Sequence, residues 1–378
     1  MSKNILIFSD GTGKDGGVGI STNVYKLFNM VLDRDEEKQI AYYDPGIGTH
    51  FTSNLFWQKL YIMDSIKVTG LPIKIKAFIE IFFKIKSNFI YLIYYVISFI
   101  KNLYFKISGD GLDENVKDCY HFIFENYNSN DKIFLFGFSR GAGTVRRLSR
   151  FIEIFGILPK SRPELIDYAF SIYKIKNKNE REIEVNKFLK LHHCMKVEIE
   201  LLGCWDTVVA LQETYKSNFF SDLNLSSKVK NARHALAIDE KRKEFSPTLF
   251  CEKILPNQTM KQVWFRGTHS DIGGGYLDSG LSDISLQWMI NESIPLGLLI
   301  YPKHNVKIRP NYQGQINESL KFFYHEENRS KYLNLKNQSN IHESVVLREE
   351  VLKDLPSWFD LKSFSVEKNN IVYLKKVS

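Results

Sequence analysis

The residues of this chain whose types and spacing could do chemistry lie in the stretch Gly137-Phe138-Ser139-Arg140-Gly141. A serine flanked by glycines at positions minus two and plus two is typical of a nucleophile held on a sharp turn between a strand and a helix. The serine must project clear of the backbone, and the glycines leave room where a side chain would clash with neighbouring elements. The pattern predicts that Ser139 attacks an electrophilic centre such as an ester carbonyl.

The elements on either side of this turn decide whether the short pattern has meaning, because chance matches are common. An apolar run from Ile133 to Phe136 precedes it, with the length and composition of a strand buried on both faces. The stretch from Ala142 to Ile154 follows it and is predicted to be a helix. The N-terminal N–H groups of that helix would point at the place where negative charge develops. We therefore prefer a nucleophile turn to a surface loop.

Two further residues complete a set that could activate a serine. Asp206 comes just after a predicted strand, Val197 to Leu202, where an acid can orient a histidine, although a lone aspartate there is more often a helix cap. His269 lies in a glycine-rich loop after the predicted strand Val263 to Phe265. The order Ser139, Asp206, His269 along the chain is the order expected of an α/β-hydrolase.

Other titratable residues are expected to have lesser roles. His121 and His234 are rivals for the base, but each lies in a stretch predicted to be helical rather than in a loop after a strand. Asp10 and Asp271 are not expected to be the acid of the set, but they could orient the site. The cluster His192-His193-Cys194 suggests a metal site, but adjacent residues of a strand point to opposite faces. Neither a metal nor an organic cofactor is therefore expected.

A second glycine-rich loop, Ser9 to Gly17, follows the predicted strand Ile5 to Phe8. Such a loop could cradle a phosphate, but neither its glycine spacing nor the residue after its lysine fits a nucleotide-binding loop. We expect instead that a backbone N–H of Gly11 or Thr12 joins the backbone N–H of Arg140 in holding an oxyanion.

The rest of the chain alternates strands with helices. Val24 to Leu32 and Leu112 to Tyr127 are predicted helices, and Ile40 to Tyr43 is a predicted strand. This alternation indicates an α/β fold with a mostly parallel central sheet and helices on both faces. We expect residues 1–378 to form a single α/β-hydrolase domain.

An apolar helical insertion is expected within that domain, at residues 51–108. From residue 76 to residue 106 Ile, Phe, Tyr and Leu dominate, and the run from Ser87 to Ile100 is uncharged. This run is shorter than the about 20 residues that a membrane-spanning helix needs. A hairpin packed on the core, a lid or membrane-docking element, and a true membrane insertion all stay open. Lysines that could meet an anionic surface flank the run: Lys84, Lys86, Lys101 and Lys106.

The net charge of the chain indicates which class of partner it could bind. The formal net charge is +8, which favours an anionic partner such as nucleic acid or an acidic membrane surface. The basic residues are not clustered as in a nucleic-acid-binding stripe, and no nucleic-acid-binding motif is present, so a membrane surface is preferred. The four cysteines form no C-x-x-C pair, and no signal peptide precedes Ile5. Synthesis in a reducing cytoplasm is therefore expected.

In blocks that occur in family order over nearly its whole length, the chain resembles the α/β-hydrolase domain of the class-one type VI secretion lipase effectors. That family was first catalogued as a domain of unknown function. The blocks are Phe8 to Gly13, Tyr43 to Thr49, Phe134 to Ala142, Trp205 to Val208, Ala232 to Glu240, Val263 to Tyr276 and Ile341 to Val345.

The resemblance implies Ser139 as nucleophile, Asp206 as acid and His269 as base. It also implies cleavage of membrane phospholipids of A1 or A2 type, and export by type VI secretion to the periplasm or membrane of a target cell. A secretion-spike protein and an immunity protein would then be partners. Two alternatives stay open: a cytoplasmic carboxylesterase for small soluble esters, and a non-enzymatic binding module on a hydrolase fold.

Overall fold

The structure is a computed structural model of the whole chain. It describes residues 2–11, 20–31, 37–46, 110–208, 225–251, 254–302, 304–319, 325–333 and 339–368. The predicted insertion at residues 51–108, with its four flanking lysines, lies outside the described residues, and so does Thr12.

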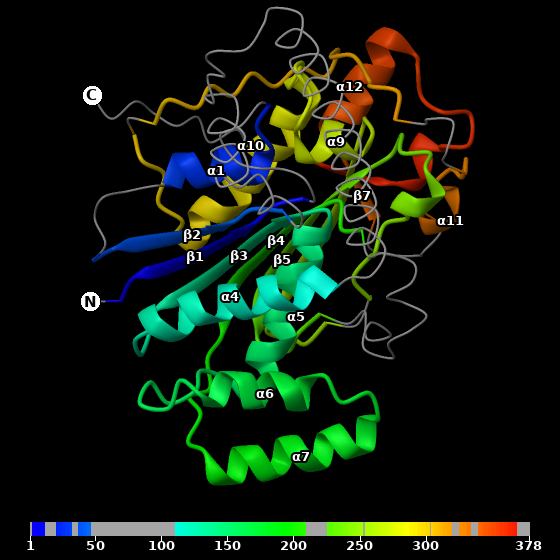
Figure 1. Ribbon diagram of the computed structural model, residues 1–378. Coiled ribbons are helices and arrows are strands. Elements are labelled where there is room, and N and C mark those ends of the chain that lie inside the picture. Colours follow the sequence, from blue (N-terminus) through cyan, green and yellow to red (C-terminus); the bar gives the residue numbers. More distant parts are fainter. Residues whose placement is uncertain are drawn as a thin grey trace, which may run out of the picture.

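The centre of the fold is an eight-stranded sheet in which every neighbouring pair of strands is parallel (Figure 1). Its spatial order is β2-β1-β3-β4-β5-β6-β7-β8. The strands are β1 (Asn4–Ser9), β2 (Gln39–Asp44), β3 (Lys132–Phe138), β4 (Ile199–Trp205), β5 (Val229–Ala237), β6 (Thr259–Phe265), β7 (Ser339–His342) and β8 (Ser365–Glu367). The predicted fold class, an α/β-hydrolase-like parallel sheet with helices around it, is confirmed.

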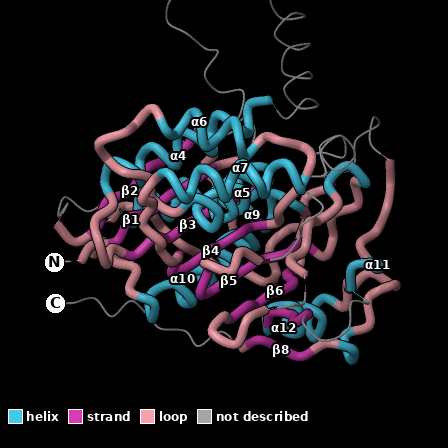
Figure 2. Tube along the Cα trace, turned by 90° about the horizontal axis from the view of Figure 1, so that it is seen from below, coloured by secondary structure: helices cyan, strands magenta, loops and turns pink. Residues whose placement is uncertain are grey.

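Helices cover both faces of the sheet (Figures 1 and 2). On one face lie α4 (Asp110–Asn126) and α5 (Arg140–Phe155), with α6 (Leu165–Tyr173) and α7 (Lys178–Leu191) outside them. On the other face lie α1 (Asn23–Val31) and α10 (Gly280–Ser293). The other helices of the described part are α9 (His269–Gly273), α11 (Ser330–Leu333), α12 (Glu343–Leu352), η1 (Lys243–Phe245), η2 (Ile294–Leu296) and η3 (Leu361–Ser363). In the described ranges, no helix combines the length and the apolar character needed to cross a bilayer.

The central strands are apolar because both of their faces are buried. Successive side chains of a strand point to opposite faces, so each strand contributes to two cores. On the face of α4 and α5 these side chains are Ile5, Ile7, Ile133 and Leu135. On the face of α1 and α10 they are Leu6, Phe8, Phe134 and Phe136. This burial explains why short uninterrupted apolar runs predicted β1 and β3 well.

Not every expectation was right. The stretch around His234 is the strand β5, not a helix, and it pairs with both β4 and β6. Its alanines and its arginine favour helices locally, but pairing on both sides overrides that preference. The mixed charges from Lys174 to Glu184, by contrast, indicate a solvated face, and this is confirmed: most of the stretch begins α7, a solvated helix with Phe188 as its buried residue.

The sheet order brings the carboxyl ends of β1 and β3 together at a reversal of the chain's direction across the sheet. β1 lies between β2 and β3, so the connections from β1 to β2 and from β2 to β3 run in opposite directions across the sheet. Ligands of open parallel sheets bind at such reversals, outside the carboxyl ends of the strands. Gly11 follows β1 and Ser139 follows β3, so both lie at this edge.

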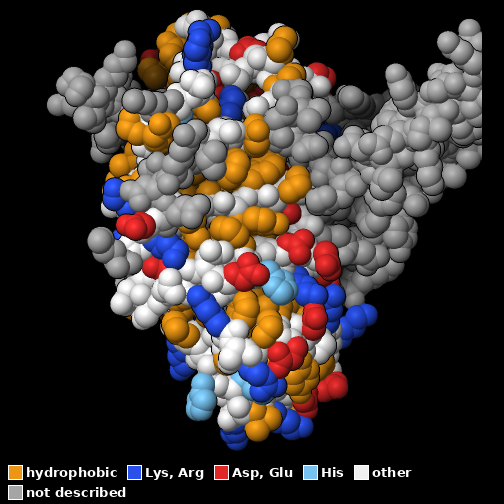
Figure 3. All heavy atoms as spheres, turned by 60° about the vertical axis from the view of Figure 1, so that its left-hand side comes forward, with side chains coloured by type: hydrophobic (Ala, Val, Ile, Leu, Met, Phe, Trp, Pro, Cys, Tyr) orange, Lys and Arg blue, Asp and Glu red, His pale blue; other side chains and the backbone are white. Residues whose placement is uncertain are grey.

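The outer side of β2 is an edge of the sheet. Four of its residues, from Ile40 to Tyr43, are only half-buried. Figure 3, which brings the left-hand side of Figure 1 forward, shows hydrophobic side chains gathered across the middle of that side of the molecule. Apolar surface is therefore exposed on the side where β2 and β1 lie.

Candidate active site

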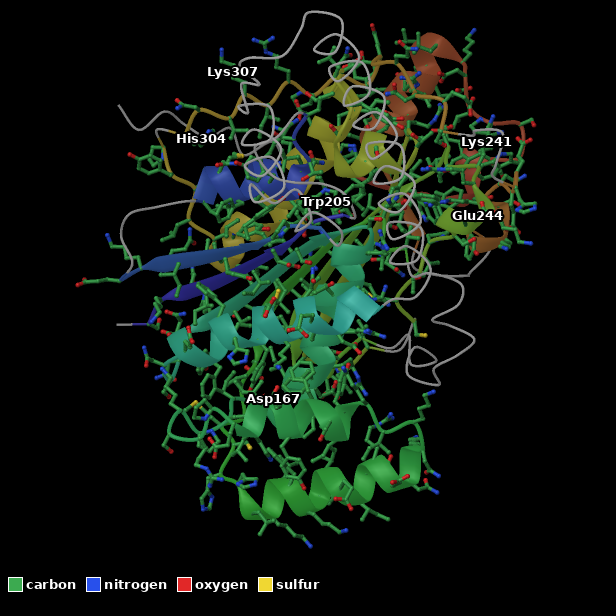
Figure 4. All side chains as sticks on the ribbon, in the orientation of Figure 1. Asp167, Trp205, Lys241, Glu244, His304 and Lys307 are labelled. Atoms are coloured by element: carbon green, nitrogen blue, oxygen red, sulfur yellow. The ribbon has the colours of Figure 1, made fainter. Side chains whose placement is uncertain are left out.

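Ser139 occupies a strained turn between β3 and α5. Its φ is 57° and its ψ is −121°, a conformation that residues with a side chain rarely adopt. The flanking glycines have no room for a side chain, because a Cβ on Gly137 would lie 2.5 Å from the Gly141 carbonyl oxygen. A Cβ on Gly141 would lie 2.1 Å from the Ser9 carbonyl oxygen. The Ser139 N–H donates to the carbonyl of Trp205 (3.0 Å), the labelled last residue of β4 in Figure 4. The turn is thus fixed against both neighbouring strands.

His269 is the first residue of α9, just after β6. Its Nε2 lies 2.9 Å from Ser139 Oγ. Thr268 caps this short helix, and Asp271 Oδ2 accepts hydrogen bonds from the Thr268 N–H (2.9 Å) and hydroxyl (3.0 Å). Asn317 donates to the same carboxylate, from its N–H to Oδ2 and from its side-chain amide to Oδ1. Asp271 therefore holds the start of the helix that carries His269, and these hydrogen bonds go to Thr268 and Asn317 rather than to the imidazole.

Asp206 lies at the carboxyl end of β4, next to β3, the strand that precedes Ser139. Its Oδ2 lies 2.6 Å from His269 Nδ1, so the imidazole is bonded to a carboxylate on one side and to a hydroxyl on the other. Asp206 is 0% exposed, and its φ of 39° is a left-handed conformation. Burial raises the pKa of Asp206, but the Arg329 guanidinium and His269 outweigh that effect and hold it well below its usual range. The carboxyl is therefore ionised at neutral pH.

Aromatic side chains enclose the imidazole. The centroid of the Phe138 ring lies 4.6 Å from the centroid of the His269 ring. The centroid of the Phe245 ring lies 5.0 Å from that of His269, with the two rings edge to face. Ser139 is 8% exposed and His269 is 4% exposed. These rings restrict both the orientation of the imidazole and the access of water to it.

Sequence reasoning missed Glu240, which holds the backbone of the histidine. Glu240 Oε2 accepts the His269 N–H (3.1 Å), while Oε1 accepts the Ser319 hydroxyl (2.9 Å). Arg242 donates to both of its oxygens. Burial raises the pKa of Glu240, but the Arg242 hydrogen bond and charge more than offset this and leave it at about 2. Glu240 lies in one of the family-like blocks, yet nothing local links it to His269.

The loop after β1 approaches Ser139. A Cβ on Gly11 would lie 3.4 Å from Ser139 Cβ, so this backbone is beside the serine. The Gly11 N–H donates to Asp10 Oδ1 (2.7 Å), and Asp10 Oδ2 accepts from the hydroxyls of Thr22 (2.5 Å) and Tyr43 (2.8 Å). Asp10 thus fixes the loop rather than the histidine, and the donor expected from Gly11 is engaged within its own turn. Arg140 is the first residue of α5.

The rival histidines lie elsewhere. His121 is in α4, among the charges that act on Asp167 of α6, a residue labelled in Figure 4. His234 is fully buried in β5, and its Nε2 accepts the backbone N–H of Thr207 (3.1 Å). Burial lowers the pKa of His234 to about 3, so this imidazole stays neutral at neutral pH. It supports the turn that follows Asp206.

The chain is similar to several known proteins. The family described as type VI secretion system phospholipase effector Tle1-like, catalytic domain, matches residues 3–292. A protein of Saccharomyces cerevisiae, the uncharacterized protein YEL023C, is 27% identical over 256 residues. That alignment covers 66% of this chain and 33% of the yeast protein, so the chain spans about a third of the length of that relative.

Two solved structures are also similar. One is an uncharacterized protein from Pseudomonas aeruginosa, with a TM-score of 0.40, 16% identity, and 81% of this chain and 47% of that chain covered. The other is the Tle1 effector bound to the VgrG spike of the type VI secretion system, with a TM-score of 0.32 and 20% identity. That match covers 73% of this chain and 51% of the other.

The family match spans more than half of the chain and includes Ser139, Asp206 and His269. The chain therefore belongs to the family of Tle1-like catalytic domains of type VI secretion phospholipase effectors.

Proposed function

We propose that this protein is a serine hydrolase that cleaves acyl esters of membrane phospholipids, a phospholipase of A type. The observation that carries the proposal is the hydrogen-bonded chain from Ser139 Oγ through the imidazole of His269 to Asp206 Oδ2, with distances of 2.9 and 2.6 Å. This chain lies at the carboxyl edge of a parallel sheet, on a strained turn before a helix. Its members match the roles of nucleophile, base and orienting acid.

The reaction proceeds in two half-reactions. His269 Nε2 takes the proton of Ser139 while Oγ attacks the ester carbonyl, and Asp206 stabilises the imidazolium that forms. Collapse of the tetrahedral intermediate transfers that proton to the leaving alcohol of the lysophospholipid. An acyl-enzyme remains on Ser139. His269 then takes a proton from a water molecule as the water attacks the acyl carbonyl, and a second tetrahedral intermediate forms. Its collapse returns that proton from His269 to Ser139 Oγ and releases the fatty acid.

The oxyanion is held by backbone N–H groups. Arg140 begins α5, so its N–H lies at the positive end of that helix dipole. A second donor comes from the loop after β1, at Gly11 or Thr12. Use of the Gly11 N–H requires it to leave Asp10, whereas use of Thr12 does not.

Membership of the Tle1-like family supports the phospholipid substrate. We propose that the protein is an effector exported by type VI secretion, acting on the membrane of a target cell from its periplasm. A secretion spike would carry it, and an immunity protein would protect the producing cell. The net charge of +8 suits an anionic bilayer surface.

We propose that residues 51–108 cover the site in water and dock on the bilayer. The chain enters this insertion just after β2 and leaves it just before α4. These two elements meet beside the site, where Asn115 of α4 donates to both oxygens of Asp44 (2.9 Å each). Each lysine near an anionic surface adds about 1 kcal/mol of attraction, which salt screens.

The docking proposal is tested by changing Lys84, Lys86, Lys101 and Lys106 to glutamate. Hydrolysis of anionic vesicles should slow, while hydrolysis of a short soluble ester should change little. An equal loss on both substrates with a lower melting temperature would mean that the insertion is part of the core.

The proposed function is tested on mixed phosphatidylethanolamine and phosphatidylglycerol vesicles, with the fatty acid and lysophospholipid products resolved by acyl position. The wild type should release both products, and Ser139→Ala should be slower by at least about a thousandfold while remaining folded. A wild type that cleaves short soluble esters but not vesicles would point to a carboxylesterase. A folded Ser139→Ala protein with wild-type turnover would overturn the mechanism.

A further inference from the structure

Arg329 is a buried cation on the far side of the candidate acid. It immediately precedes α11 and is 2% exposed. Its Nη1 donates to Asp206 Oδ1 (2.6 Å) and its Nη2 donates to Asp206 Oδ2 (3.0 Å). Such a bidentate ion pair fixes the plane of the carboxylate as well as its position.

The same two nitrogens also bind backbone carbonyls. Nη1 donates to Ala237 O (2.9 Å), and Nη2 donates to Phe245 O (2.6 Å). Ala237 ends β5, and Phe245 ends the short helix η1. The guanidinium is therefore held by the scaffold on one side while it holds Asp206 on the other.

Arg329 completes the hydrogen bonding of the carboxylate. Asp206 Oδ1 accepts from Arg329 and from the Ala237 N–H (3.1 Å), and Oδ2 accepts from Arg329 and from His269 Nδ1. An ionised carboxylate has about four acceptor positions, so all are in use. With Arg329 in place, the carboxylate cannot rotate away from the imidazole without breaking several hydrogen bonds.

Arg329 also binds the residue whose aromatic ring packs on His269. The Phe245 carbonyl that it binds belongs to the residue whose ring packs edge to face on His269. The Arg242 guanidinium also lies over that ring, 3.4 Å from its centroid. The segment from Lys241 to Glu244, labelled at its ends in Figure 4, runs beside the segment that leads into α11, through a bridge between Arg242 and Glu326.

The titratable neighbours of Asp206 come from several elements. They are Arg329 before α11, His269 of α9 and the neutral His234 of β5, while Glu240 acts on His269 and is paired with Arg242. Among these groups, Arg329 is the permanent cation bonded to the acid. A buried carboxylate without such a partner is strongly disfavoured in its ionised form.

We propose that Arg329 is a positioning residue of the hydrolytic site. It keeps Asp206 ionised and aligned with His269 Nδ1, and it fixes the position of Phe245, whose ring packs on His269. This inference rests on the proposed serine-hydrolase function. Arg329 acts through Asp206 and Phe245 and does not itself touch the reacting atoms.

Arg329→Lys and Arg329→Met separate alignment from charge. Lysine keeps the charge but cannot bind both oxygens and both carbonyls, so kcat should fall by about a hundredfold with little change in KM. Methionine also removes the charge, so the acid limb of the kcat/KM profile should in addition move to higher pH, by about one unit or more. Both profiles are measured on a short soluble ester, together with the melting temperature.

Arg348 provides a matched control. It is also buried, pairs with Asp354 through Nε and Nη2, and donates from Nη1 to the carbonyls of Tyr312 and Gly314 (2.7 Å each). It contacts none of Ser139, Asp206 or His269. Arg348→Lys should therefore lower the melting temperature while leaving kcat and the pH profile near those of the wild type.

Two results would overturn the inference. One is an Arg329→Lys enzyme with the kcat of Arg348→Lys, and the other is an Arg329→Met enzyme with an unshifted acid limb. If Arg329→Met does not fold, Arg329→Ala with added methylguanidinium replaces it: recovery of turnover supports the inference, and a folded protein without recovery opposes it. Reaction of the wild type with a fluorophosphonate keeps the two proposals apart, because a wild type that is not labelled at Ser139 would contradict the serine mechanism itself.

Discussion

The strain at Ser139 predicts an unusual order of stability among inactive variants. Residues with a Cβ held in a conformation such as φ 57°, ψ −121° cost about 1–3 kcal/mol, and glycine avoids most of that cost. Glycine in turn loses about 0.5–1 kcal/mol through the greater freedom of the unfolded chain. Ser139→Ala and Ser139→Gly both lose the hydrogen bond to His269, so that loss cancels between them. Ser139→Gly should therefore be more stable than Ser139→Ala by about 1 kcal/mol.

Equilibrium urea unfolding of the two variants measures this difference. Ser149, a buried residue in the body of α5 without a positive φ, is the control on the same helix. There the order should reverse, with Ser149→Gly less stable than Ser149→Ala by about 1 kcal/mol. A Ser139→Ala protein as stable as Ser139→Gly, with the expected reversal at Ser149, would refute the claim that the nucleophile turn is strained.

Three further predictions concern the surroundings of the nucleophile. His269→Ala should slow ester hydrolysis by about a thousandfold, whereas His234→Ala should mainly lower the melting temperature; the opposite pattern would assign the base to His234. Burial raises the pKa of Asp44 to about 7, so the folded state binds a proton that the unfolded state has already lost above about pH 4. The free energy of unfolding of the wild type should then fall as pH rises from about 4 to 7, by up to about 4 kcal/mol, whereas that of Asp44→Asn should not fall in this way. A wild type with the same free energy of unfolding at pH 5 and pH 8 would contradict this. Gly273→Ala places a Cβ 2.0 Å from the Phe138 ring, so it should cost about 1–3 kcal/mol and reduce turnover; an unchanged melting temperature would count against that packing.

The central elements of the fold could be predicted because their pattern has a single cause. The runs Ile5 to Phe8 and Ile133 to Phe136 are apolar at every position since both faces of these strands are covered by helices. β5 was mispredicted because its residues Ala232 to Ala237 favour helices, and the pairing with β4 and β6 that overrides them is not local. The short strands β7 and β8, the last two of the sheet, carry little pattern of their own.

The residues of the candidate site likewise differ in whether local sequence context could predict them. Ser139, Asp206 and His269 each follow a strand, so their local context and their order along the chain could predict them as site residues. The structure places the three in one hydrogen-bonded chain. Arg329 and Glu240 have no such signal, since an arginine or a glutamate in a loop is usually solvated. Arg329 meets its acid across 123 residues of sequence, through contacts that only the folded chain creates. The donor expected from Gly11 instead bonds to Asp10, a side chain that the glycine-rich pattern alone does not orient.

We propose that Ser139 is the nucleophile and that His269 activates it. A fluorophosphonate probe followed by mass spectrometry of the digested protein tests it directly, with vesicle hydrolysis measured on the same preparation. We expect one adduct, on Ser139, formed in step with the loss of phospholipid hydrolysis and at least about a hundredfold more slowly in His269→Ala. Complete inhibition with the adduct on another residue, or hydrolysis that continues while Ser139 is fully labelled, would contradict it.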